Sequence, residues 1–260
     1  MTDCRTQYPI LLVHGLNCRD EVPFFYWGRV PALLMAHGAR VYLSGQDACG
    51  TIGHNARALE RRIRQVLAAE DSEKLNLIAH SKGGLEARYC ISTLCLADRV
   101  ASLTTICTPH HGSKTAAAWQ RRPLARMALA GAEDLYWSLR GDDQPDFRAV
   151  LEELTPAAME RFNQANPDSP QVYYQSWGAR LEKRYHGEGG MARFLLALTG
   201  ADGFTDGLVS PDSAVWGHWR GTLSCVSHLD AADSRGRDLP HFSVSDFYLR
   251  LVRELVEMGF

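Results

Sequence analysis

The chain has 260 residues, which is enough for one large α/β domain or two small ones. Hydrophobic residues make up 45% of it, as in a globular protein with a real core, and 28 Lys and Arg residues against 30 Asp and Glu residues give a net charge of −2. This near balance, without long runs of like charge, argues against a partner such as nucleic acid or an anionic membrane surface.

The first apolar run, Ile10–Val13, is too short for a signal peptide, and no apolar run is long enough to span a bilayer. The seven cysteines have an odd count and no Cys-x-x-Cys spacing, so we expect buried thiols rather than disulfides or a zinc cluster. As written, the sequence predicts a cytoplasmic protein without a transmembrane segment, or a secreted one if a signal has been removed.

Strand and helix signals alternate through the first 107 residues. Strands are expected at Ile10–Val13, Val41–Leu43, Leu75–Ala79 and Ala101–Cys107, and helices at Val30–His37, Asn55–Ala69 and Gly83–Leu96. This order predicts an α/β fold with a mostly parallel central sheet and helices on both faces.

The pattern changes over residues 114–166, where strand signals vanish. Helix formers dominate Trp119–Ala132 and Phe147–Phe162, with a polar break at Gly141–Asp146. We interpret residues 114–166 as a helical cap inserted into one domain that spans residues 1–260. The apolar side chains of a cap above a nucleophile are suited to form an acyl pocket.

Beyond the cap, strand signals return. Strands are expected at Gln171–Ser176 and Thr222–Val226, a flexible loop at Gly187–Gly190, a short helix at Met191–Leu198 and a terminal helix at Ser243–Met258. Ser243 is the expected N-cap of the terminal helix, because Asp246 follows it in a capping-box arrangement.

Ser81 lies in the strongest catalytic motif of the sequence. It sits between a buried strand that ends at Ala79 and a helix that begins near Gly83, which is the context of a nucleophile elbow. The sharp turn needs small residues two positions before and two after the serine; Ala79 satisfies this where the usual pattern has glycine. The alternative, that Ser81 only caps a helix, does not account for this context.

A serine nucleophile also needs donors for the oxyanion of its tetrahedral intermediate. We expect one from the backbone N–H of Lys82, the residue after the nucleophile. The second is expected from the N–H of Leu16, because Gly15 lets the loop after the first strand approach a substrate closely. The side chain of His14 is interpreted as a hydrogen-bonded loop histidine without chemistry.

In this kind of site the acid follows the serine, and the histidine follows the acid. Asp206 is the expected acid, because it lies in a turn with Gly207. Asp202 and Asp212 are its rivals, but Asp212 follows a proline and has the context of a helix N-cap.

Four histidines follow the cap, namely His186, His218, His228 and His241. We favour His228 as the general base, because it comes directly after the last expected strand, where a loop can turn its ring toward the elbow. His241 precedes the terminal helix and is interpreted as a loop or capping histidine.

Seven motifs carry a family resemblance: Tyr8–Leu16, Tyr26–Gly28, Ala79–Gly84, Thr108–Ser113, Leu154–Asn163, Asp206–Val209 and His228–Asp230. With them the chain resembles the bacterial true lipases of Pseudomonas and Burkholderia type and the related clostridial esterases. The resemblance covers most of the chain and implies an α/β-hydrolase fold. It carries the family's catalytic roles over to Ser81, Asp206, His228, Leu16 and Lys82.

The metal sites of this family match less well. The calcium-dependent members use the acid two residues after the histidine, which is Asp230 here, and a glutamine where this chain has Ser234. The zinc-bearing relatives have an insertion before the elbow that this chain lacks. We therefore expect no cofactor and no metal. Asp230 is the remaining calcium candidate, with a hydrogen bond inside its own loop as the alternative.

These observations predict a serine carboxylic ester hydrolase, a lipase or esterase, that cleaves medium- to long-chain acyl esters through an acyl-enzyme. Its expected partner is a small-molecule or lipid ester, met at a lipid–water interface. A thioesterase or acyltransferase with the same triad is the first alternative. A non-catalytic binding protein of the same fold is the second, and the intact Ser81, Asp206 and His228 set argues against it.

Overall fold

The structure is a computed structural model that describes residues 4–20, 26–181 and 205–260. The loop expected at Gly187–Gly190, the helix expected at Met191–Leu198, and the candidates His186 and Asp202 lie outside the described residues.

A parallel sheet forms the centre of the molecule. Its strands are β1 (Ile10–Val13), β2 (Val41–Leu43), β3 (Leu75–His80), β4 (Val100–Ile106), β5 (Tyr173–Arg180) and β6 (His218–Ser224). They lie in the order β2-β1-β3-β4-β5-β6, and all neighbours are parallel. The direction of winding reverses between β1 and β3, and sheets of this kind bind ligands at the carboxyl ends beside such a reversal.

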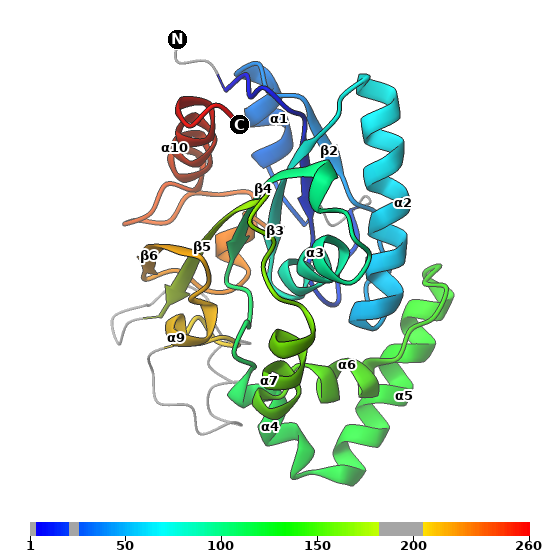
Figure 1. The fold of residues 1–260 in the computed structure, drawn as a ribbon. Coiled ribbons are helices and arrows are strands. Elements are labelled where there is room, and N and C mark those ends of the chain that lie inside the picture. The colour runs from blue at the N-terminus through cyan, green and yellow to red at the C-terminus, as the bar shows by residue number, and fades with distance from the viewer. Residues whose placement is uncertain (1–3, 21–25, 182–204) are drawn as a thin grey trace.

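Helices cover both faces of the sheet (Figure 1). They are α1 (Val30–Ala36) and α10 (Val244–Glu257) on one face, and α2 (Ile52–Glu70) and α3 (Lys82–Ser92) on the other. Ile10 and Leu12 of β1 join the core under α1 and α10, whereas Leu11 and Val13 join the core under α2 and α3. This alternation makes a strand that is apolar on both sides, and confirms the predicted fold class. Among the described residues, no helix is long and apolar enough to cross a membrane.

Several element boundaries differ from those expected. β5 continues to Arg180, and β6 begins at His218, four residues before Thr222. The start of β6 was missed because it is the exposed edge of the sheet and carries polar side chains. α2 begins at Ile52 because the Thr51 side chain caps it.

The cap consists of α4 (Lys114–Gln120), α5 (Pro123–Leu139), α6 (Phe147–Glu153) and α7 (Pro156–Ala165), beyond the carboxyl ends of the strands (Figure 1). Each of the helices expected at Trp119–Ala132 and Phe147–Phe162 is divided into two helices. The prediction of one continuous helix in each range was therefore wrong. A proline causes each break, because Pro123 and Pro156 cannot donate a helical hydrogen bond and instead begin new helices.

The cap packs on the loop that follows β2. Ala48, Cys49 and other body residues share an apolar cluster with side chains of α4 to α7. The Asp142 carboxylate, between α5 and α6, accepts hydrogen bonds from the N–H groups of Ala48 (3.1 Å) and Cys49 (2.8 Å). Buried polar contacts therefore fix the cap next to the end of the sheet.

Candidate active site

Ser81 stands at the junction of β3 and α3 with φ 55° and ψ −133°. This left-handed conformation is unfavourable for a residue with a side chain, and such strain is a feature of functional turns. The turn fits because its neighbours are small: a Cβ on Gly83 would lie 2.4 Å from the carbonyl oxygen of His14. The elbow conformation expected from the motif is therefore present.

Ser81, His228 and Asp206 form one hydrogen-bonded chain. His228 Nε2 lies 2.8 Å from Ser81 Oγ, and His228 Nδ1 lies 2.7 Å from Asp206 Oδ2. The Asp206 side chain is 1% exposed and that of His228 is 6% exposed. The geometry is that of a nucleophile, a general base and an acid that orients the base.

The turn at Asp206 fixes the carboxylate. Its second oxygen, Oδ1, accepts hydrogen bonds from the N–H groups of Leu208 (2.9 Å) and Val209 (2.8 Å). Gly207 has φ 110°, a value that suits only glycine. The backbone N–H of His228 also donates to the Asp206 carbonyl at 2.9 Å, so the acid and the base are joined twice.

The rival side chains lie elsewhere. Asp212 is exposed in the first turn of α9 (Pro211–Ala214), whose N-cap is Ser210. His218 stacks on Tyr173 at the sheet edge, with ring centroids 5.0 Å apart, and His241 is exposed before α10. None of these three is hydrogen-bonded to Ser81 in the described part of the chain.

The loop after β1 passes directly against the serine. A Cβ on Gly15 would lie 2.8 Å from Ser81 Cβ and 2.6 Å from the Tyr26 hydroxyl, so only glycine fits. The N–H groups of Leu16 and Lys82 donate to no other residue within the described ranges. Both are therefore available to a ligand beside Ser81, as an oxyanion hole requires.

Tyr26 and His80 form a second buried pair beside this chain. The Tyr26 hydroxyl lies 2.5 Å from His80 Nδ1, and the His80 ring packs on that of His228 with centroids 4.6 Å apart. Burial lowers the pKa of His80 well below its usual value, and the nearby charge of His228 adds to this. His80 is therefore a neutral neighbour of His228. In the sequence, Tyr26 belongs to the Tyr26–Gly28 motif and His80 to the Ala79–Gly84 motif, but neither motif indicates that the two side chains meet.

An ion pair holds the segment after His228 against the N-terminal half. Asp233 accepts from the backbone N–H of Arg29 at 2.6 Å and from its guanidinium at 2.9 and 3.0 Å. This bidentate pair has one buried partner, because the Asp233 side chain is 1% exposed. The hydrogen bonds with Asp233 raise the pKa of Arg29 above its ordinary value.

Sequence comparison finds named relatives of this chain. A triacylglycerol lipase of Saccharomyces cerevisiae is 29% identical over 255 residues, which are 90% of this chain and 74% of the yeast protein. A triacylglycerol lipase of Pseudarthrobacter phenanthrenivorans is 36% identical over 184 residues, 65% of this chain and 56% of that protein. The chain thus spans little more than half the length of this bacterial relative. No protein-family model matches.

The chain is similar in sequence to these triacylglycerol lipases. The crystal structure of Staphylococcus hyicus lipase has a TM-score of 0.73 to it at 16% identity, covering 96% of both chains. This likeness confirms the α/β-hydrolase fold. The expected resemblance to bacterial lipases is confirmed, and the relatives support a serine carboxylic ester hydrolase.

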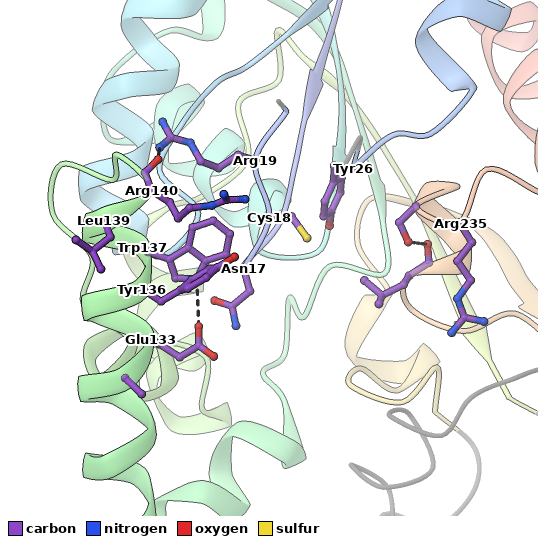
Figure 2. Close-up of a pocket in the computed structure, with 13 residues that line it drawn as sticks. Asn17, Cys18, Arg19, Tyr26, Glu133, Tyr136, Trp137, Leu139, Arg140 and Arg235 are labelled. Atoms are coloured by element: carbon purple, nitrogen blue, oxygen red, sulfur yellow. Dashed lines mark hydrogen bonds between the residues drawn. The ribbon is translucent and has the colours of Figure 1, made fainter. Parts of the chain in front are cut away.

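A cavity of about 1070 Å³ lies near the triad, although Ser81, Asp206 and His228 do not line it themselves. Asn17 and Leu229, which follow Leu16 and His228 in the chain, line it on the body side. Figure 2 shows Tyr136 and Trp137 of the cap across from Arg235, with Tyr26 and Cys18 between them. The cavity therefore lies between the cap, the oxyanion loop and the histidine loop.

The residues of the histidine loop do not fit the calcium site of the lipase family. The Asp230 carboxylate accepts a hydrogen bond from the Ser227 hydroxyl and lies 3.7 Å from Arg235 Nε. Ser234 donates its hydroxyl to the Leu229 carbonyl at 2.9 Å. Calcium needs six to eight oxygen ligands, and these oxygens already serve the loop itself.

Two groups of possible metal ligands come together from distant parts of the chain, within the described residues. His80, Cys107 and His228 form one, and Asp47, His54 and Asp143 form the other. Burial raises the pKa of the Cys107 thiol, and the charge of Asp206 raises it further. A thiol with a raised pKa is a poor metal ligand. Sequence spacing gave no sign of either group.

Proposed function

We propose that this lipase homologue hydrolyses carboxylic esters with medium- to long-chain acyl groups, using Ser81 as nucleophile. The observation that carries the proposal is the unbroken chain of hydrogen bonds from Asp206 through His228 to Ser81 Oγ, at 2.7 and 2.8 Å. The names of the relatives support lipid esters as the substrate class.

The chemistry follows from the contacts. Ser81 Oγ attacks the ester carbonyl while its proton moves to His228 Nε2, and the negative charge on the former carbonyl oxygen is received by the N–H groups of Leu16 and Lys82. Asp206 stabilises the resulting imidazolium through Nδ1. His228 then protonates the leaving alcohol. Water attacks the acyl-enzyme as it gives a proton to His228, and His228 returns this proton to Ser81 Oγ as the carboxylic acid leaves.

The side chains of the cap support the proposal that the substrate has a long acyl chain and is met at a lipid–water interface. Five apolar side chains of α5 are exposed, namely Leu124, Met127, Leu135, Tyr136 and Leu139. Trp119 and Leu129 are partly buried and Trp137 is buried, so they contribute to packing rather than to this surface. An exposed apolar face next to an active-site cavity suits contact with lipid.

Covalent labelling tests the proposal most directly. A fluorophosphonate should add to Ser81 with loss of fluoride, and Ser81→Ala should neither react nor hydrolyse p-nitrophenyl esters, while its thermal unfolding stays close to that of the wild type. Residual activity above a few per cent in Ser81→Ala would sink the assignment. A higher kcat/KM for acyl thioesters than for matched oxygen esters would favour the thioesterase alternative.

A further inference from the structure

The two expected oxyanion donors belong to separate loops. Leu16 follows β1, and Lys82 is the first residue of α3, after β3. An oxyanion is stabilised well only when both N–H groups reach it at about 2.7–3.1 Å. Something must therefore hold the two loops in register, because a displacement of about 1 Å is costly to catalysis.

The side chain of Lys82 turns away from solvent into a buried ion pair. Lys82 and Glu86, one helical turn later, are each 1% exposed, and the Lys82 ammonium donates to Glu86 Oε1 and to the Gly50 carbonyl (2.9 Å). Asn55 donates to the same carboxylate at 2.9 Å. The pair is thus surrounded by hydrogen bonds, as a buried pair must be.

Gln46 connects this ion pair to the other loop. Its amide nitrogen donates both to Glu86 Oε2 and to the His14 carbonyl, each at 3.0 Å. The backbone carbonyl oxygen of Gln46 lies 3.1 Å from His14 Nε2, and that of Gly15 lies 2.8 Å from His14 Nδ1, so the single N–H of a neutral ring donates to one of the two. A buried chain of hydrogen bonds therefore runs from the Lys82 ammonium through Glu86 and Gln46 to the His14 carbonyl, two residues before Leu16.

We propose that the side chains of Lys82, Glu86 and Gln46 are positioning residues that hold the two halves of the oxyanion hole together. The inference rests on the proposed ester hydrolysis at Ser81 and deepens it. Lys82 then has two roles: its backbone N–H faces the oxyanion, and its side chain fixes where that N–H points.

Stability alone is a poor reason for this arrangement. Desolvation offsets most of the attraction in a buried ion pair. The Gln46 side-chain oxygen is also buried without a hydrogen-bond partner among the described residues, which is a cost. The Gln46 amide nitrogen therefore donates to both Glu86 and the His14 carbonyl, while its oxygen has no hydrogen-bond partner among the described residues.

The variant Gln46→Met cuts the bridge and removes the unpartnered oxygen, while Glu86 keeps Lys82 and Asn55. We expect kcat for a soluble p-nitrophenyl ester to fall about 10- to 100-fold with KM within about twofold, less than the loss of a whole donor. Inhibition by an alkyl trifluoromethyl ketone, whose Ser81 adduct carries an oxyanion, should weaken by a similar factor. Inhibition by the matching ether, which lacks a carbonyl, should not change.

Gln175→Met is the matched control, because Gln175 in β5 is also 1% exposed and donates to Thr104 at 2.8 Å. Gln175→Met should leave kcat at the wild-type value, and also the ratio of the inhibition constants of the ketone and the ether. Both should hold even if its melting temperature changes. If Gln46→Met does not fold, the double variant Lys82→Met/Glu86→Gln, which removes both charges together, should show the same loss.

A folded Gln46→Met with wild-type kcat and ketone affinity would overturn the proposal, as would equal losses in both glutamine variants. Failure of the proposed function gives a different result, since a wild-type chain that neither hydrolyses esters nor reacts with a fluorophosphonate leaves no oxyanion hole to position.

Discussion

At the scale of single residues, chain order and contacts select the same acid and base. Asp206→Asn and His228→Ala should each lower kcat/KM by about 10⁴-fold, because the imidazole then loses its orientation or its nitrogen. Asp212→Asn and His241→Ala should stay within about twofold, since both side chains are exposed away from Ser81. Steady-state kinetics on the four variants decide this, and an inactive His241→Ala would contradict it.

Two buried histidines contribute to the pH dependence of stability. Burial lowers the pKa values of His80 and His110 well below 6.5, helped by the charges of His228 and Arg88 respectively. As the pH falls below 6.5 the unfolded chain takes up protons that these folded rings do not. Folding should thus weaken by up to about 1.4 kcal/mol per pH unit for each ring, down to its folded pKa.

Urea unfolding of wild type and His110→Asn between pH 7.5 and 5 measures this slope. The variant should be less stable at neutral pH, because the contacts of His110 with Thr105 and Arg88 are lost. Its free energy of unfolding should nevertheless fall less steeply with acidification. Equal slopes in both proteins would mean that folding does not lower the pKa of His110.

At the scale of elements, α5 is the part of the cap suited to meet a lipid surface. Leu135 and Leu139 lie one turn apart, with exposures of 63% and 79%. Burying two leucines in lipid gains about 1.5–3 kcal/mol each when complete. Even if the interface gains only about 1.4 kcal/mol of this in total, the double variant Leu135→Ser/Leu139→Ser should need an emulsion at least about tenfold more concentrated for half-maximal rate.

Activity of this variant on a dissolved short-chain ester should be unchanged. Met35→Ser on α1 is the control, because Met35 is also exposed (51%) but lies on a helix that packs against α10, not in the cap. If the wild type shows no rise in rate across the solubility limit of its substrate, the site is that of an open esterase.

At the scale of the whole molecule, we expect folding and activity to be independent of metal. The acids after the histidine are engaged: Asp230 with Ser227 and Arg235, and Asp233 with Arg29. Extended dialysis against EDTA should leave both the melting temperature and kcat within error of the untreated protein. A large loss that Ca²⁺ restores would identify Asp230 as a ligand; a loss that only Zn²⁺ restores would point to Asp47, His54 and Asp143.

The sequence alone determined the parallel sheet and the elbow. Alternating apolar runs and helical spacing predict β1 to β4 closely, because strands buried on both faces have little freedom in composition. Ser81 was visible because a tight turn restricts its neighbours to small residues. The catalytic acid and base followed from chain order, with rivals that local patterns could rank but not exclude.

Only the tertiary structure brought distant side chains together. Tyr26 meets His80 across 54 residues, and Gln46 meets Glu86 across 40, so no local periodicity records either contact. The sequence predicted that the backbone N–H of Lys82 is an oxyanion donor, but not that its side chain lies in a buried ion pair with Glu86. The position of this side chain depends on how α2, α3 and two loops pack, because a charge is stable in the interior only where partners from several segments surround it.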